Sequence, residues 1–173
     1  PKCGVEIEGW IIDQHGYPQA KIYDLMSICK KGSLQEELSQ YNFEFDTAPL
    51  LITKNYLQKL QSKIETQWEA LVKSAAKIDA KLILIGTLPS LTVNMLRTDV
   101  MSRLNRYQLL NKAILNQHEK QQIDINISGK DSFSHQMESI MLESATTSLQ
   151  INFQTHPQHA HHLYNACLLA SLP

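Results

Sequence analysis

The stretch from Cys3 to Asp13, C-G-V-E-I-E-G-W-I-I-D, predicts the strand around which this protein folds. It is rich in β-branched and aromatic residues, which favour extended backbone, and the turn-like H-G-Y-P at His15 to Pro18 closes it. Glu6 and Glu8 stand at alternate positions within it. Because successive side chains of a strand point to opposite faces, this strand has one acidic face and one apolar face.

Two later stretches repeat the same alternation: N-F-E-F-D-T-A at Asn42 to Ala48 and T-S-L-Q-I-N-F-Q at Thr147 to Gln154. We expect the three strands to share a sheet whose apolar positions lie on one face. The positions expected on the opposite, polar face are all carboxylates or amides: Glu6, Glu8, Glu44, Asp46, Gln150, Asn152 and Gln154.

Helical periodicity separates the predicted strands. It is clearest from Lys54 to Ala80, with Thr53 as a candidate N-cap, and it recurs from Asp99 to Gln117. The other elements that we expect are a short polar helix at Leu34–Gln40, a buried central strand at Lys81–Gly86, a weak strand at Ile123–Ile127 and a last helix that begins near Pro157. The sequence thus predicts an α+β fold, with a mainly antiparallel sheet and helices packed on one face, in a single domain over residues 1–173.

Composition argues against several classes of partner. Sixteen basic and seventeen acidic residues nearly balance, and no basic run exceeds Lys30-Lys31, so we expect no nucleic-acid partner. No stretch reaches the ~20 apolar residues of a membrane span, and we expect no membrane partner and a cytoplasmic location. The sequence carries no signal for oligomeric state.

The polar face itself suggests a metal site. Carboxylates that face one another across strands repel, and a counter-charge relieves them. Mg²⁺ suits this role because it takes oxygen ligands and is typically held by one or two carboxylates together with substrate phosphates. The alternative is an ordinary antiparallel sheet with one solvated face, which shows the same alternation.

Arginine is confined to one place in the chain: Arg97, Arg103 and Arg106 are the three arginines of the sequence. The planar guanidinium group binds phosphate and carboxylate through paired hydrogen bonds, so this confinement indicates anion recognition, with Arg106 as the candidate. The alternative is a helical Asp99–Arg103 ion pair at positions i and i+4.

The order of these motifs resembles that of the glutamate-cysteine ligases. The motifs that carry the resemblance are G-V-E-I-E at Gly4–Glu8, N-F-E-F-D-T-A-P at Asn42–Pro49, L-I-G-T-L-P at Leu84–Pro89, R-Y at Arg106-Tyr107 and T-S-L-Q-I-N-F-Q at Thr147–Gln154. The resemblance implies a glutamine synthetase-like fold, in which the inner face of a curved antiparallel sheet holds divalent cations, ATP and glutamate. It also implies site residues: Glu6, Glu8 and Glu44 as metal ligands, Gln150 and Asn152 at the nucleotide, and Arg106 at phosphate or substrate carboxylate.

The activity that the resemblance implies is ATP-dependent joining of glutamate to an amine such as cysteine, with Mg²⁺ or Mn²⁺, through an acyl phosphate. Members of that family are more than twice as long, so we expect the chain to be an N-terminal portion of such a protein or a degenerate homologue, and in either case to be inactive alone. Two alternatives remain open, namely a ligase with another amine acceptor and a non-catalytic module that binds nucleotide and metal. Fold resemblance does not rank these three.

Overall fold

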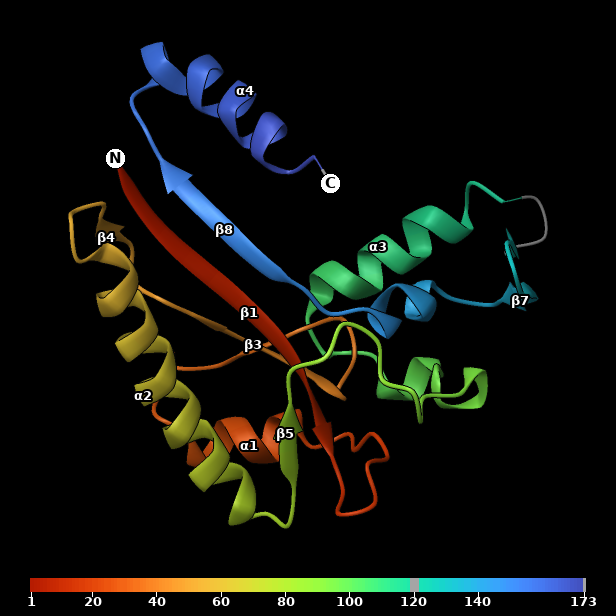
Figure 1. Cartoon of the computed structure of the whole chain (residues 1–173). Helices are drawn as coiled ribbons and strands as arrows, with labels where there is room; N and C mark the ends of the chain where they lie inside the picture. The colour runs from red at the N-terminus through yellow and green to blue at the C-terminus, as the bar shows by residue number, and fades with distance from the viewer. Residues whose placement is uncertain (119–121, 173) are drawn as a thin grey trace.

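Strand β1 (Lys2–Ile12) is the centre of the molecule. The computed structural model describes residues 1–118 and 122–172, and in it β1 runs diagonally through a mainly antiparallel open sheet with helices around it (Figure 1). Four described strands pair with β1, all antiparallel to it: β3 (Asn42–Asp46), β4 (Leu50–Leu51), β5 (Lys81–Ile83) and β8 (Leu149–Gln154). The mixed α+β class and the antiparallel sheet predicted from the sequence are therefore confirmed.

The register of β1 brings the predicted polar positions onto one face. Glu8 lies directly opposite Glu44 of β3, and Glu6 lies opposite both Asp46 of β3 and Gln150 of β8. Directly opposed residues of an antiparallel pair share a face, so the alternation of the three strands is in phase across the sheet. Two lysines join the same face at the ends of β1, Lys2 opposite Gln154 of β8 and Lys81 of β5 opposite Ile12.

A first hydrophobic core lies on the opposite face of β1 and β3. Helices α1 (Ile22–Ile28) and α2 (Tyr56–Ala76) cover it. The indole of Trp68 on α2 stacks over Phe43 and Phe45, with ring centroids 6.4 and 6.3 Å apart respectively. The periodicity that predicted α2 therefore marks the helix face that covers the sheet.

A second core lies on the other face, over the far half of β1. Trp10 and Ile12 continue the face of Glu6 and Glu8, but they are buried under described residues of the segment from Leu88 to Ala145. That segment contains η1 (Val93–Met95), η2 (Thr98–Val100), α3 (Asn105–Leu115), the hairpin of β6 (Ile123–Ser128) and β7 (Ser132–Met137), and η3 (Ile140–Ala145). The expectation that helices pack on one face was therefore wrong, because the polar face of β1 becomes apolar after Glu8.

Several element boundaries also differ from the sequence prediction. Residues Leu34–Gln40 do not form a helix: β2 (Gln35–Glu36) pairs with β3 instead. The predicted central strand at Lys81–Gly86 is the short β5, which pairs with β1 alone among the described strands. Asn55 rather than Thr53 is the N-cap of α2, and α3 begins at Asn105 rather than Asp99.

The last part of the chain lies outside both cores. Strand β8 is exposed along its whole length, and its apolar side chains Leu149, Ile151 and Phe153 are 58%, 58% and 42% exposed. After η4 (Pro157–His159), helix α4 (Ala160–Ala170) confirms the predicted last helix and has no buried residue. Among the described residues, no helix combines the length and the apolar composition that crossing a bilayer requires.

Gly9 allows β1 and β3 to approach each other closely. A Cβ at this position would meet Phe43 Cζ at 2.6 Å and the carbonyl oxygen of Ile83 at 2.8 Å. We predict that Gly9→Ala lowers the free energy of unfolding by about 1–3 kcal/mol, the usual cost of overpacking a core. Chemical denaturation measures it. Gly86→Ala is the matched control, since its Cβ has no neighbour closer than 3.8 Å, and an equal loss in both variants would contradict the close approach.

Candidate metal centre

Three carboxylates converge where the polar face of the sheet meets the second core. Glu8 and Glu44 face each other across β1 and β3, and Glu37, which directly follows β2, joins them. Each offers an oxygen, and these oxygens all lie within 4.8 Å of one another. Opposite ligands of an octahedral Mg²⁺ are about 4.2 Å apart, so small side-chain movements bring the three carboxylates (the acidic triad) into range of one ion.

Two members of the acidic triad are held by hydrogen bonds from elsewhere in the fold. The backbone N–H of Ser148 donates to Glu8 Oε2 at 2.8 Å, while the N–H of Glu8 donates to the carbonyl of Ser148 at 3.0 Å. The hydroxyl of Tyr107, on α3, donates to Glu37 Oε2 at 3.1 Å. The segment before β8 therefore orients Glu8, and helix α3 orients Glu37, from outside the sheet.

Among the described residues, no salt bridge balances the charge of the acidic triad. Burial, the hydrogen bond that it shares with Glu37 and the charges of Glu37, Asp46 and Glu6 raise the pKa of Glu44 to about 8. The two salt bridges found among the described residues are Lys73–Glu69 and Arg97–Asp99, and neither involves the triad. A proton on Glu44 therefore relieves part of the repulsion near neutral pH, and a bound cation would do so more completely.

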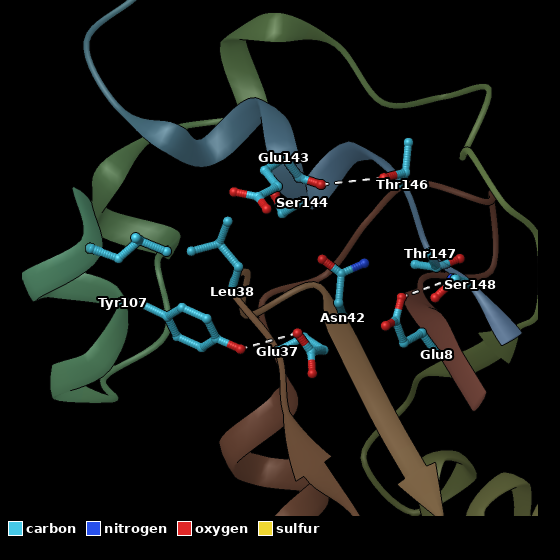
Figure 2. A pocket seen from close by; sticks show the side chains of 11 residues that line it. Glu8, Glu37, Leu38, Asn42, Tyr107, Glu143, Ser144, Thr146, Thr147 and Ser148 are labelled. Carbon is cyan, nitrogen blue, oxygen red and sulfur yellow. Dashed lines mark hydrogen bonds between the residues drawn. The ribbon is translucent and has the colours of Figure 1, made fainter. Parts of the chain in front are cut away.

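A pocket of about 270 Å³ opens beside two members of the triad (Figure 2). Its lining comes from β1, β3, α3, η3 and the segments next to them: Glu8, Glu37, Leu38, Asn42, Tyr107, Leu110, Glu143, Ser144, Thr146, Thr147 and Ser148. Lysine, arginine and histidine do not occur among these described lining residues. The volume is slightly below the range of pockets that enclose drug-sized ligands, so it suits a small molecule.

Asn42 is the strongest sign that this pocket receives a ligand. The residue is 2% exposed, and neither Oδ1 nor Nδ2 of its amide has a hydrogen-bond partner. Figure 2 shows this amide in the middle of the lining side chains, between Glu8 and Glu37 on one side and Glu143 and Ser144 on the other. A buried amide without partners costs about 1–3 kcal/mol, a cost that a ligand of matching polarity removes. Oxygen donors dominate the site, and this donor set fits a hard divalent cation.

The structure brings together some of the predicted site residues and leaves others apart. Glu8 and Glu44 belong to the acidic triad, whereas Glu6 lies one position farther along the same face, outside it. Gln150 and Asn152 are exposed on β8, opposite Glu6 and Gly4. They line the open part of the polar face, on the other side of β1 from Glu44.

The arginines are arranged differently from the sequence prediction. Arg106 is exposed, and its Nη2 donates to the hydroxyl of Tyr107 at 2.7 Å, so it reaches the triad only through Tyr107 and Glu37. The proposed Asp99–Arg103 pair was wrong: Asp99 precedes α3 and pairs with Arg97 at 2.8 Å. Arg103 instead lies over the ring of Tyr23, 4.3 Å from its centroid.

Sequence reasoning missed Glu37, Asn42 and Glu143. Glu37 fell inside the segment that was predicted to be a helix. In the extended backbone found there, adjacent Glu36 and Glu37 point to opposite sides, so that Glu36 accepts hydrogen bonds from Ser102 and Tyr23 while Glu37 reaches the triad. Asn42 carried a signal, because it precedes Phe43 and Glu44 in the same alternation. Glu143, on η3, carried none.

Comparisons of this chain with protein-family models, with curated proteins and with solved structures find no match. The chemistry of the site is therefore inferred from the positions of its own residues.

Replacement of Asn42 tests whether its amide is strained by a lack of partners. We predict that Asn42→Leu, which has nearly the same size, raises the free energy of unfolding of the ligand-free protein by about 1–3 kcal/mol. Chemical denaturation measures the change, and Asn94→Leu, at an exposed position of η1, is the control with an expected change near zero. A loss of stability in Asn42→Leu would show that the amide has partners in solution.

The raised pKa of Glu44 predicts how stability depends on pH. In the unfolded chain this carboxyl loses its proton near its ordinary pKa of 4.5, whereas in the folded protein it keeps the proton up to about pH 8. The folded state therefore holds more protons in this window, and its stability falls as the pH rises from 4.5 to 8 and then levels off. Glu44→Gln, which cannot ionise, should remove this fall.

Thermal melts of the metal-free protein between pH 4.5 and pH 9 measure this dependence. Glu65→Gln, an exposed change on α2, is the control and should keep the pH dependence of the original protein. The same slope in the Glu44→Gln protein would mean that other groups are responsible.

Proposed function

We propose that the acidic triad of Glu8, Glu37 and Glu44 holds a divalent cation, Mg²⁺ or Mn²⁺, in an ATP-dependent carboxylate-amine ligase that resembles the glutamate-cysteine ligases. The observation that carries the proposal is the convergence of three carboxylates, without a cationic side chain among them, beside a pocket with an unpaired buried amide. The substrates implied by the resemblance are glutamate, ATP and an amine such as cysteine.

The polar face of the sheet has a carboxylate-rich part and an amide-rich part, and this arrangement supports the proposed ligase. The triad lies where β1 meets the second core, and β8 extends the same face outward with the exposed amides of Gln150 and Asn152. A nucleotide is too large for the pocket of about 270 Å³. We therefore propose that it lies over β1 and β8, beside Glu6, Gln150 and Asn152. In this arrangement the sheet is part of a glutamine synthetase-like funnel.

The chain's own residues position the groups in this proposal. The backbone N–H of Ser148 fixes Glu8 Oε2, and the hydroxyl of Tyr107 fixes Glu37 Oε2, so Glu8 and Glu37 would hold the ion with orientations set by the rest of the fold. Arg106 is exposed beside Tyr107, where its guanidinium can approach a phosphate or carboxylate group. When bound, the cation supplies neutralisation of phosphate charge, which is the main requirement of phosphoryl transfer.

Removal of a carboxylate from the triad tests the metal site. We predict that Glu8→Gln and Glu37→Gln leave folding intact and weaken Mg²⁺ binding by about tenfold or more. Even residues that only support a ligand typically cost about 10–100-fold in metal affinity when they are replaced. Mg²⁺ at a hundred times its dissociation constant should stabilise the original protein by about 2.7 kcal/mol and raise Tm by about 5–10 °C. Thermal melts and calorimetric titration with MgCl₂ measure both effects.

Glu65→Gln on α2 is the control for the metal titrations and should bind Mg²⁺ like the original protein. An unchanged melting temperature at high Mg²⁺ and Mn²⁺, or equal binding by all three variants, would refute the metal site. The ligase assignment is tested separately, by measuring amine-dependent ADP release by the full-length parent protein across a panel of amines. No release would favour a non-catalytic module that uses the same site, and release that does not depend on an amine would indicate ATP hydrolysis rather than ligation.

A further inference from the structure

The last part of the described chain exposes apolar surface that carries no charge. All sixteen basic and seventeen acidic residues of the sequence lie before Ser144, so β8, η4 and α4 contain no aspartate, glutamate, lysine or arginine. Yet every residue of β8 is exposed, and α4 has no buried residue. A surface that meets only water normally carries charged side chains, whereas the centre of a protein–protein interface is depleted of them. This region therefore has the composition of an interface.

Strand β8 also has a free edge. Among the described strands it pairs with β1 alone. The N–H of Glu8 donates to the carbonyl of Ser148 directly opposite it, so the hydrogen-bonded pairs with β1 fall at Ser148 and at every second residue after it. The backbone groups of Leu149, Ile151 and Phe153 therefore point to the edge away from β1. No proline or charged residue within β8 blocks this edge, and an open apolar edge readily pairs with another strand.

We infer that this edge pairs with the same edge of a second copy of the chain, antiparallel and about a two-fold axis at Ile151. In this register Leu149 of each copy lies opposite the partner's Phe153, and Gln150 lies opposite the partner's Asn152. Apolar side chains meet on one face and amides on the other, without a charge on either. Each of the three residues that point outward exchanges two backbone hydrogen bonds with its counterpart. The strand is thus complementary to itself, which favours a second copy over a strand of another sequence.

The exposed area is also of the size that a dimer needs. Strand β8 and helix α4 expose six large apolar residues, each by 42–72%: Leu149, Ile151, Phe153, Tyr164, Leu168 and Leu169. At roughly 200 Å² for a fully exposed residue of this size, they offer about 700 Å² of surface. A standard interface buries about 800 Å² on each partner. In the view of Figure 1, β8 lies between β1 and α4, so α4 lies on the same side of β8 as the free edge.

The molar mass in solution tests the pairing. Sedimentation velocity should give about 39 kDa, twice the 19.7 kDa of one chain. Ile151→Lys should weaken dimerisation about tenfold or more, because two ammonium groups then meet at the axis and the apolar contact is lost. Ile151→Glu should do the same. An equal mixture of these two variants should dimerise again, because lysine then faces glutamate across the axis.

Two further variants complete the test. Leu109→Lys, on α3 at a residue that is 67% exposed, is the matched control and should dimerise like the original protein. Ile151→Pro removes an N–H that points away from β1, so it should leave the pairing of β1 with β8 intact and disrupt the dimer. Thermal melts report whether each variant is folded, and Ile151→Pro decides if the charged variants are not.

Several outcomes would overturn the inference. A mass of 19.7 kDa at every concentration would do so and would leave the edge to a strand of another protein. A dimer that all three changes at Ile151 leave unchanged would place the interface elsewhere. A mixture of folded Ile151→Lys and Ile151→Glu proteins that stays monomeric would rule out the two-fold axis at this residue. None of these outcomes bears on the acidic triad, since Leu149, Ile151 and Phe153 belong neither to it nor to the pocket beside it.

Discussion

The antiparallel register between β1 and β3 places two like charges, Glu8 and Glu44, directly opposite each other. Their repulsion alone would favour another pairing. The opposite face prevents this, because Phe43 and Phe45 of β3 pack under Trp68 in the first core. A slip by one residue would move these aromatic rings to the polar face and the carboxylates into the core. Burial of the aromatic rings on one face of the sheet therefore keeps Glu8 and Glu44 opposite each other on the other face, despite the repulsion between their carboxylates.

That repulsion is concentrated where the polar face ends. Trp10, the next residue on the face of Glu8, is fully buried in the second core, and Asn42 lies opposite it across the strands. The triad is thus next to apolar surroundings, where burial favours the protonated form of Glu44 and strengthens attraction to any ion that displaces the proton. Glu6, farther along the strand, lies on the open part of the same face. Position along one strand therefore separates the acidic triad from the open surface over which we propose that a nucleotide lies.

The sequence predicted those features that depend on alternation within a single segment. Strands β1, β3 and β8, the long helix α2 and the common face of Glu8 and Glu44 all follow from a period of two or of 3.6 residues. Features that depend on contacts between distant segments could not be predicted from the sequence. The pair Glu36-Glu37 reads as part of a polar helix until β3 is known to lie beside it, and Trp10 gives no sign that residues far along the chain will cover it. Glu143 reaches the pocket through the packing of η3 alone.

The link between Glu8 and Ser148 joins residues 140 positions apart. During synthesis on a ribosome, β1 and β3 can pair early, but one edge of β1 then stays without β8 while more than half of the chain is still being made. Contacts of such long range form slowly, and an unpaired strand edge can capture other extended segments in the meantime. The candidate site is thus one of the last parts of the molecule to be completed, and a nascent chain that lacks residues 148–154 holds its carboxylates without the backbone that orients them.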